Sequence, residues 1–209
     1  MIRLYDSLIS GNAYKARLVL TQLRIPFTHI LLDTLKGETR TPEFLTVNPY
    51  GQVPAVVLDD GEVLTQSGAI LCYFAEGTPL LPADKLSRAR VLQWMFFEQN
   101  SLEPYLGAAY FWLTLVKGGR ELQVHALEDW IEKGYQAFNV MEKHLATNDF
   151  VAAGHYTIAD IALYGYTHLA HECDFDLAAF PSIRAWLNRV VDQPSHVPMD
   201  WHPAAEAAE

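Results

Sequence analysis

A strand that begins with proline lies in the stretch NPYGQVPAVVLDDG (Asn48–Gly61). Its segment AVVL (Ala55–Leu58) is apolar and β-branched, and the DDG after it is typical of a turn, so the pattern predicts a buried strand. Proline has no backbone N–H to donate to a neighbouring strand, which makes Pro54 an unusual first residue. The pattern alone does not explain why the strand begins there, because an ordinary trans proline also occurs at strand starts.

Short strands and helices alternate on both sides of this stretch, over the first eighty residues. Strands are predicted where short apolar runs end in turn residues, and helices where apolar residues recur every three or four positions. The expected strands are Ile2–Tyr5, Phe27–Asp33, Ala55–Leu58 and Glu62–Leu64, and the expected helices are Ala13–Leu23, a short one from Pro42, and Gln66–Ala75. This β-α-β-α-β-β-α order predicts a mixed sheet covered by helices.

The rest of the chain is predicted to be helical. GTPLLPAD (Gly77–Asp84) has the glycine and prolines of a linker, and Pro104 should kink or divide the long helical run that follows. Later helices are expected within residues 127–145, 157–173 and 180–194, the second of them central and buried. The tail HPAAEAAE (202–209) is expected to be disordered. We therefore expect an α/β domain over residues 1–79 and an all-α domain over residues 85–209.

Charge and composition narrow the classes of function. With 15 basic and 25 acidic side chains, the formal net charge of −10 disfavours a nucleic-acid surface and binding to acidic membranes. No apolar run reaches the ~18–20 residues of a membrane span, and no signal peptide is expected, so we expect a cytoplasmic protein. Cys72 and Cys173 lie far apart; reduced thiols are expected, although one disulfide stays open, and no spacing suggests a metal site.

Four segments together resemble the cytosolic glutathione S-transferases, in particular bacterial-like members. They are SGNAYKARLVL, NPYGQVPAV, QSGAILCYFAEG and GHYTIADIALYGY. The resemblance covers nearly the whole chain. It implies a thioredoxin-like N-terminal domain that binds glutathione, an all-α C-terminal domain that contributes the pocket for an electrophile, and assembly as a homodimer. Glutathione would be the co-substrate, with no metal.

The resemblance also implies how glutathione is held. In that family the Val-Pro bond is cis, so that the backbone of Val53 turns outward and pairs with the bound peptide, as in strand addition. Gln66 and Ser67 would grip the γ-glutamyl end, where a helix N-terminus offers free N–H groups and partial positive charge. Many relatives have Glu where this chain has Gln66, and Ser67 as a simple helix cap stays open.

Three residues of the polar loops are weaker candidates. Gln52, Arg40 and Lys36 would bind the glycine carboxylate of glutathione by the same resemblance. The alternative is that these side chains are only solvated, which is the usual state of polar and charged residues in loops.

The residue after the first strand divides the family into tyrosine, serine and cysteine types. Tyr5 lies inside the strand and no cysteine is near this loop, so the resemblance implies a serine type with Ser10 donating to the glutathione thiolate. Asn12 falls where some relatives carry a second polar or thiol residue. From the residues alone, a serine before a helix is most often an N-cap.

The C-terminal half offers a folding motif and a group of aromatic residues. TIAD (Thr157–Asp160) is a capping box, so we expect Asp160 to be structural rather than catalytic. The aromatic residues expected to line an apolar pocket for the electrophile are Tyr105, Tyr110, Phe111, Trp112 and Tyr166. The sequence does not show which of them face the core instead.

The expected function is thus transfer of glutathione to a small hydrophobic electrophile, with a role in detoxification. Two alternatives stay open: a glutathione-dependent isomerase or dehalogenase on the same fold, and a non-catalytic stress or interaction protein. A thiol-disulfide reductase is disfavoured because neither cysteine lies near the N-terminal loop. The identity of the electrophile is not contained in these patterns.

Overall fold

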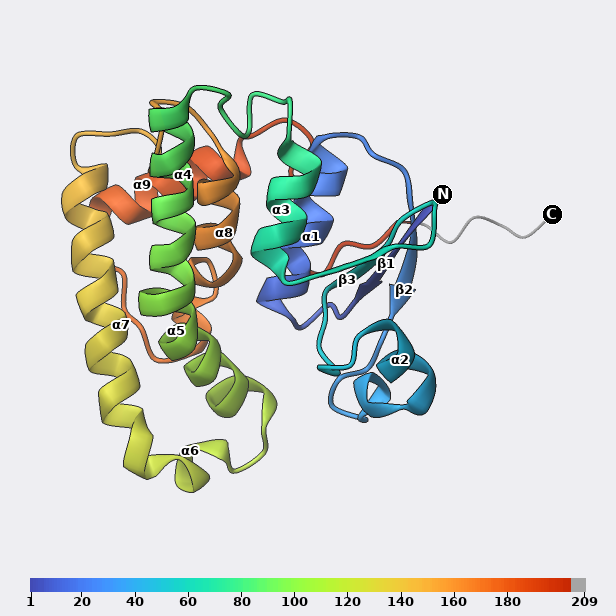
Figure 1. Ribbon diagram of the computed structural model, residues 1–209. Helices are drawn as coiled ribbons and strands as arrows, with labels where there is room; N and C mark the ends of the chain where they lie inside the picture. Colours follow the sequence, from blue (N-terminus) through green and yellow to red (C-terminus); the bar gives the residue numbers. More distant parts are fainter. Residues whose placement is uncertain (204–209) are drawn as a thin grey trace. The chain divides into compact units, whose positions relative to one another are not determined.

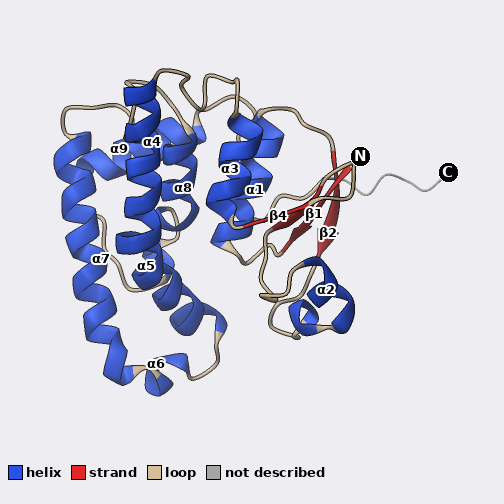
Figure 2. Cartoon of the chain, viewed as in Figure 1, coloured by secondary structure: helices blue, strands red, loops and turns tan. Residues whose placement is uncertain are grey.

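The computed structural model describes residues 1–203 and divides the chain into two compact units. One unit consists of Met1–Phe74 and the described residues from Pro194 onward, and the other of Ala75–Gln193. The first is α/β and the second is all-α, which confirms the predicted fold class (Figure 2). The disorder expected for residues 202–209 falls almost wholly outside the described residues.

A four-stranded sheet in the order β2-β1-β3-β4 forms the centre of the first unit (Figure 1). Its strands are β1 (Ile2–Asp6), β2 (Phe27–Leu31), β3 (Ala55–Val57) and β4 (Val63–Thr65). β1 pairs parallel with β2 and antiparallel with β3, so Leu4 lies opposite His29 on one side and Val56 on the other. β3 is buried along its length, as its apolar sequence predicts.

Three helices accompany this sheet: α1 (Gly11–Gln22), α2 (Pro42–Val47) and α3 (Ser67–Ala75), with a 3₁₀ turn at Glu38–Arg40. α2 begins with proline, and the Thr41 hydroxyl caps it by accepting from the Phe44 N–H at 3.3 Å. The Phe44 ring packs against Tyr5 of β1, with 5.5 Å between ring centroids. The observed order β-α-β-α-β-β-α is the predicted one.

The described end of the chain packs on α1, which no sequence pattern indicated. The Tyr14 hydroxyl donates to the carbonyl of Val197 at 2.6 Å, and Arg17 donates to the carbonyl of Met199. Arg17 also pairs with Asp6, which His29 contacts at 2.7 Å. Arg17 and Asp6 are fully buried, and buried charges of this kind persist only when they are paired.

The second unit is built from helices and contains two π-helical turns. Its elements are α4 (Lys85–Phe97), a π turn (Glu98–Leu102), α5 (Glu103–Tyr110), a π turn (Phe111–Leu115), α6 (Gly119–Leu122), α7 (Val124–Leu145), α8 (Ile158–Thr167), a 3₁₀ turn (Ala170–Glu172) and α9 (Pro181–Val191). Pro104 lies in the first turn of α5, so it starts a new helix after the π turn. Every residue of α8 is buried, which confirms the expected central helix.

The capping box at the start of α8 is also confirmed. Thr157 and Asp160 exchange hydrogen bonds between side chains and backbone, as the TIAD sequence predicts. Asp160 further accepts from the Val151 N–H at 3.0 Å and from the Trp186 indole N–H at 2.9 Å. It therefore joins α8 to the preceding loop and to α9.

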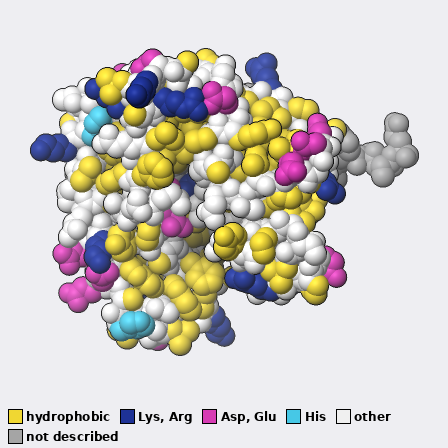
Figure 3. All heavy atoms as spheres, viewed as in Figure 1, with side chains coloured by type: hydrophobic (Ala, Val, Ile, Leu, Met, Phe, Trp, Pro, Cys, Tyr) yellow, Lys and Arg dark blue, Asp and Glu magenta, His cyan; other side chains and the backbone are white. Residues whose placement is uncertain are grey.

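Charged side chains of both signs are mixed with apolar ones on the face drawn in Figure 3, and Lys and Arg occur there singly or in small groups. Within residues 1–203, no helix combines the length and apolar character that crossing a membrane requires.

Candidate active site

Ser10 is the residue on which α1 begins. Its backbone is extended, and its hydroxyl oxygen caps the helix by accepting from the Ala13 N–H at 3.2 Å. Within the described part of the chain, no acceptor for the Ser10 hydroxyl proton is found. The side chain thus uses its oxygen in the cap and can still donate outward.

Asn12 is the second residue of the same helix and links it to α3. The Asn12 amide oxygen accepts from the Lys15 ammonium at 2.8 Å and from the Ser67 hydroxyl at 3.2 Å. Lys15 is 1% exposed, so its charge is held inside the protein. Ser67 donates to Asn12 from the first residue of α3, which fixes the starts of the two helices against each other.

Lys15 was missed in the sequence analysis, because a lysine on a helix is usually solvated. The available signal was its spacing, since residues at i and i+3 are neighbours on a helix surface and Asn12 stands three positions earlier. Tyr5, by contrast, packs against α2 and takes no part in this cluster.

Gln66 stands immediately before α3 in a strained conformation. Its φ of 67° lies in the left-handed region, which residues other than glycine rarely adopt. Its side chain is exposed, so burial does not explain the conformation. Strained backbone of this kind is concentrated at binding and catalytic sites, which makes the Gln66–Ser67 turn a candidate for ligand contact.

Val53 offers backbone groups that the sheet does not use. The Val53–Pro54 peptide bond is cis, and β3 begins only at Ala55. Among the described residues, neither the N–H nor the C=O of Val53 takes part in a hydrogen bond. An extended peptide could therefore pair with the chain at Val53.

The three weaker candidates lie in differing surroundings. The Gln52 carbonyl accepts from the buried Asn48 amide at 2.7 Å, which holds the segment before Val53 in place. Arg40 is exposed and donates to the Tyr50 carbonyl at 3.0 Å. Lys36 forms an exposed ion pair with Asp33 at 2.9 Å, and hydrogen bonding between the two lowers the pKa of Asp33 and raises that of Lys36.

The five aromatic candidates of the second unit lie in different environments. Tyr110 and Tyr166 are buried, and burial raises the pKa of Tyr110 to about 12. Tyr105 lines a cavity of 300 Å³ beside Lys133, whose ammonium lies 5.3 Å from the ring centroid. Phe111 is 41% exposed and contacts the neighbouring Trp112 edge-on at 5.4 Å.

Cys72 and Cys173 do not form a disulfide with each other. Cys173 is buried, which raises its pKa to about 12, so its thiol lacks the character of a reactive nucleophile. In residues 1–203, no cluster of three or more His, Cys, Asp or Glu side chains is arranged to hold a metal ion. The side chains that meet at the starts of α1 and α3, here called the α1–α3 cluster, present hydroxyl groups from Ser10 and Ser67, the amide of Asn12 and the ammonium of Lys15.

Comparisons with known proteins identify the family of both halves of the chain. Two domain models match: glutathione S-transferase, N-terminal domain, over residues 9–76, and glutathione S-transferase, C-terminal domain, over residues 124–189. The crystal structure of a possible glutathione S-transferase from Rhodopseudomonas palustris is 58% identical with a TM-score of 0.94, over 97% of this chain and 99% of that one.

Two curated relatives carry more specific names. The maleylacetoacetate isomerase of Rhizobium meliloti (strain 1021) is 36% identical over 87% of each chain. The disulfide-bond oxidoreductase YfcG of Escherichia coli (strain K12) is 31% identical over 93% of this chain and 92% of its own length.

Proposed function

This chain belongs to the glutathione S-transferase family, and we propose that it is a serine-type transferase that activates the glutathione thiol for attack on a small hydrophobic electrophile. In this proposal the α/β unit binds glutathione and the all-α unit contributes the electrophile pocket. The predicted boundary of 85–209 is too long for the helical unit, because the described residues from Pro194 onward pack with the first unit. The homodimer, the cytoplasmic location and the role in detoxification belong to the same proposal.

The hydroxyl of Ser10 is the observation that carries the proposal. Its oxygen accepts from the Ala13 N–H, which leaves its proton available to another acceptor. A hydrogen bond to a thiolate is charge-assisted and contributes roughly 1.5–3 kcal/mol. At about 1.36 kcal/mol per pKa unit, this would lower a thiol pKa from ~8.5 by one to two units, and the N-terminus of α1 acts in the same direction.

The rest of the cluster would bind and orient the tripeptide. Val53 would pair with its backbone, and Gln66 and Ser67 would receive the γ-glutamyl end at the start of α3. Asn12 holds Ser67, and Lys15 holds Asn12, so the buried ammonium positions the binding groups and adds positive potential. Arg40, tied to the Tyr50 carbonyl, is better placed than the ion-paired Lys36 to receive a carboxylate.

A glutathione-dependent isomerase is the second candidate, favoured by the similarity to a maleylacetoacetate isomerase. The Ser10-stabilised thiolate would serve that reaction as well, by adding to a double bond and leaving again after rotation. The similarity to YfcG also favours disulfide chemistry, in which the thiol of glutathione would be the nucleophile, because neither cysteine is close to Ser10 in the sequence.

Titration of the bound thiol tests the proposal. Ultraviolet absorbance should give a thiolate pKa one to two units higher in Ser10→Ala than in wild type, and turnover at neutral pH should fall roughly ten- to hundredfold. Ser10→Thr, which keeps a hydroxyl, is the matched control and should retain most activity. An unchanged thiolate pKa in Ser10→Ala would reduce Ser10 to a helix cap. Aryl halides, maleylacetone and a mixed disulfide, assayed in parallel, separate transfer, isomerisation and reduction.

A further inference from the structure

A buried carboxylate stands at the end of β1, before the turn that leads to Ser10. Asp6 is fully buried and is the last residue of β1. Its Oδ1 accepts from the Ser7 N–H at 2.6 Å. Its Oδ2 accepts from the Arg17 guanidinium of α1 and lies 2.7 Å from Nε2 of His29 on β2. One side chain therefore joins two strands, α1 and the start of the turn.

The turn after Asp6 ties Ser10 to Ser7. The Ser10 N–H donates to the Ser7 carbonyl at 2.9 Å, and the Ser10 carbonyl accepts from the Tyr14 N–H of α1 at 2.9 Å. Ser7 is only 4% exposed, so its own N–H needs an acceptor inside the protein, and Asp6 is that acceptor. The place of Ser10 is thus set by Asp6 at one end of the turn and by α1 at the other.

Arg17 connects α1 back to the same carboxylate. It stands seven positions after Ser10, which is about two helical turns, so both residues lie on one side of α1. Its guanidinium is fully buried and donates both to Asp6 and to the Met199 carbonyl, which hold it from two sides. A buried ion pair gives little net stability compared with apolar residues of similar volume. Stability alone therefore does not account for two buried charges beneath the turn that carries Ser10.

The cap bond by itself holds the Ser10 hydroxyl loosely. Its 3.2 Å from the Ala13 N–H lies at the long end of the range for such bonds. A hydrogen bond to a thiolate weakens steeply when the donor is misaligned, and supporting hydrogen bonds are what keep such a donor in its productive position. The contacts of Asp6 provide that support from the strand side of the turn.

We propose that Asp6 and Arg17 are positioning residues, which hold the Ser10 hydroxyl where it donates to the glutathione sulfur. The inference rests on the proposed function of Ser10 and adds the groups through which the fold controls it. It also carries a distinctive sign. By its field alone, loss of a nearby carboxylate would favour a thiolate and lower the thiol pKa, whereas loss of positioning would raise it.

Ultraviolet titration of the bound thiol in Asp6→Asn tests this inference. Asparagine still offers an oxygen to the Ser7 N–H but no longer pairs with the charge of Arg17. The thiolate pKa should rise by about 0.5–1 unit, because a misplaced hydroxyl forfeits about half of its charge-assisted bond, and turnover at neutral pH should fall about three- to tenfold. In the Ser10→Ala background the same change should add no rise, since no hydroxyl is left to position.

A second variant separates positioning from folding. Asp6→Asn alone leaves the buried Arg17 without its counter-charge, which destabilises a fold, whereas Asp6→Asn/Arg17→Met removes both charges together. The double variant should fold with a free energy of unfolding close to that of wild type and still raise the thiolate pKa by about 0.5–1 unit, because the link between β1 and α1 is gone. A purely structural role would leave the thiolate pKa of this folded variant unchanged.

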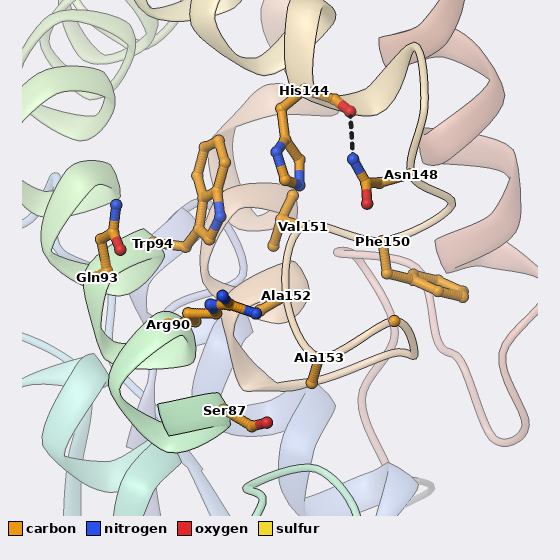
Figure 4. A pocket seen from close by; sticks show the side chains of 11 residues that line it. Ser87, Arg90, Gln93, Trp94, His144, Asn148, Phe150, Val151, Ala152 and Ala153 are labelled. Atoms are coloured by element: carbon orange, nitrogen blue, oxygen red, sulfur yellow. Dashed lines mark hydrogen bonds between the residues drawn. The ribbon is translucent and has the colours of Figure 1, made fainter. Parts of the chain in front are cut away.

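Two matched controls change the same residue types elsewhere. Asp59→Asn removes an exposed carboxylate that pairs with the N-terminus at 2.8 Å. Arg90→Gln removes an exposed arginine beside a cavity of 390 Å³ in the second unit (Figure 4). Neither should move the thiolate pKa.

The outcomes separate this inference from the proposed function. An unchanged or lowered thiolate pKa in the folded Asp6 variants would overturn the positioning role, and so would a rise of equal size in the Ser10→Ala background. If Ser10→Ala itself leaves the pKa of the bound thiol unchanged, the proposed function fails, and the positioning role fails with it. If Ser10→Ala raises that pKa and the Asp6 variants do not, the positioning role alone is wrong.

Discussion

Replacement of Asp160 by alanine should destabilise the protein more than a lost helix cap would. The carboxylate is fully buried and accepts four hydrogen bonds: from the N–H and hydroxyl of Thr157, from the Val151 N–H and from the Trp186 indole. Burial raises the Asp160 pKa to about 6 although these bonds lower it, so the group is ionised at neutral pH.

The magnitude follows from the donors that the substitution leaves behind. In Asp160→Ala, the N–H groups of Val151, Thr157 and Trp186 stay buried and lose their acceptor. Each unsatisfied buried donor costs about 1–3 kcal/mol. Three such donors would cost about 3–9 kcal/mol. Removal of a carboxylate that was itself costly to bury offsets part of this, so we take the lower half of the range and expect a loss of about 3–6 kcal/mol. A capping box alone would account for only about 1–2 kcal/mol.

Urea unfolding at pH 7, followed by circular dichroism, measures this loss. Trp186→Phe removes the indole donor, so the double variant Asp160→Ala/Trp186→Phe should cost about 1–2 kcal/mol less than the sum of the single variants. Activity per folded molecule should survive in Asp160→Ala. A change in stability below about 1 kcal/mol, or a stable but inactive variant, would refute the reasoning and place Asp160 in the chemistry.

Two further predictions concern charge. The pKa of Asp160 in the folded state, about 6, exceeds its ordinary 3.8, so between these pH values the folded protein binds more protons than the unfolded chain. The stability of wild type relative to Asp160→Asn should therefore fall by up to about 3 kcal/mol as the pH rises from 4 to 6, and then level off. A difference that does not change with pH in paired urea titrations would contradict this. Lys15→Met should raise the KM for glutathione about tenfold in steady-state kinetics, because Asn12 loses the donor that holds it in place for Ser67. Lys143 is exposed, and the control variant Lys143→Met should leave the KM unchanged. Equal KM values in Lys15→Met and wild type would show that Lys15 is not part of the binding cluster.

The predictable parts of the fold were those encoded over a few neighbouring residues. β3 was found from four apolar residues and a turn, and the start of α8 from the TIAD motif, because hydrophobic periodicity and capping are local. The attachment of Val197 and Met199 to α1 joins positions 182 or 183 residues apart, and no periodic signal marks it. The π turn before Pro104 likewise left no pattern beyond the proline itself.

The residues of the candidate site likewise divide into those that local sequence indicated and those that depend on tertiary packing. Ser10 and the Gln66–Ser67 turn were indicated because they stand where a strand passes into a helix, a boundary that sequence marks well. Lys15 was missed because its burial depends on tertiary packing. The aromatic residues of α5 and its π turn could not be sorted, because a π turn adds a residue to the helical repeat and rotates the faces that follow it.

The two proposed roles of Ser10, helix cap and thiolate donor, are compatible because one hydroxyl in the same position can serve both. A cap requires an oxygen that accepts from the Ala13 N–H, and thiolate stabilisation requires a proton directed away from the helix; a hydroxyl supplies both at once. Aspartate caps equally well but would place a negative charge beside the sulfur. Ser10→Asp should therefore keep the wild-type free energy of unfolding within about 0.5 kcal/mol and yet raise the pKa of the bound thiol at least as much as Ser10→Ala. Ser10→Ala loses the cap as well, at a cost of about 1 kcal/mol. If Ser10→Asp retained thiolate formation at neutral pH, the thiol would owe its activation to the α1 N-terminus or to Lys15, and Ser10 would be left with the cap alone.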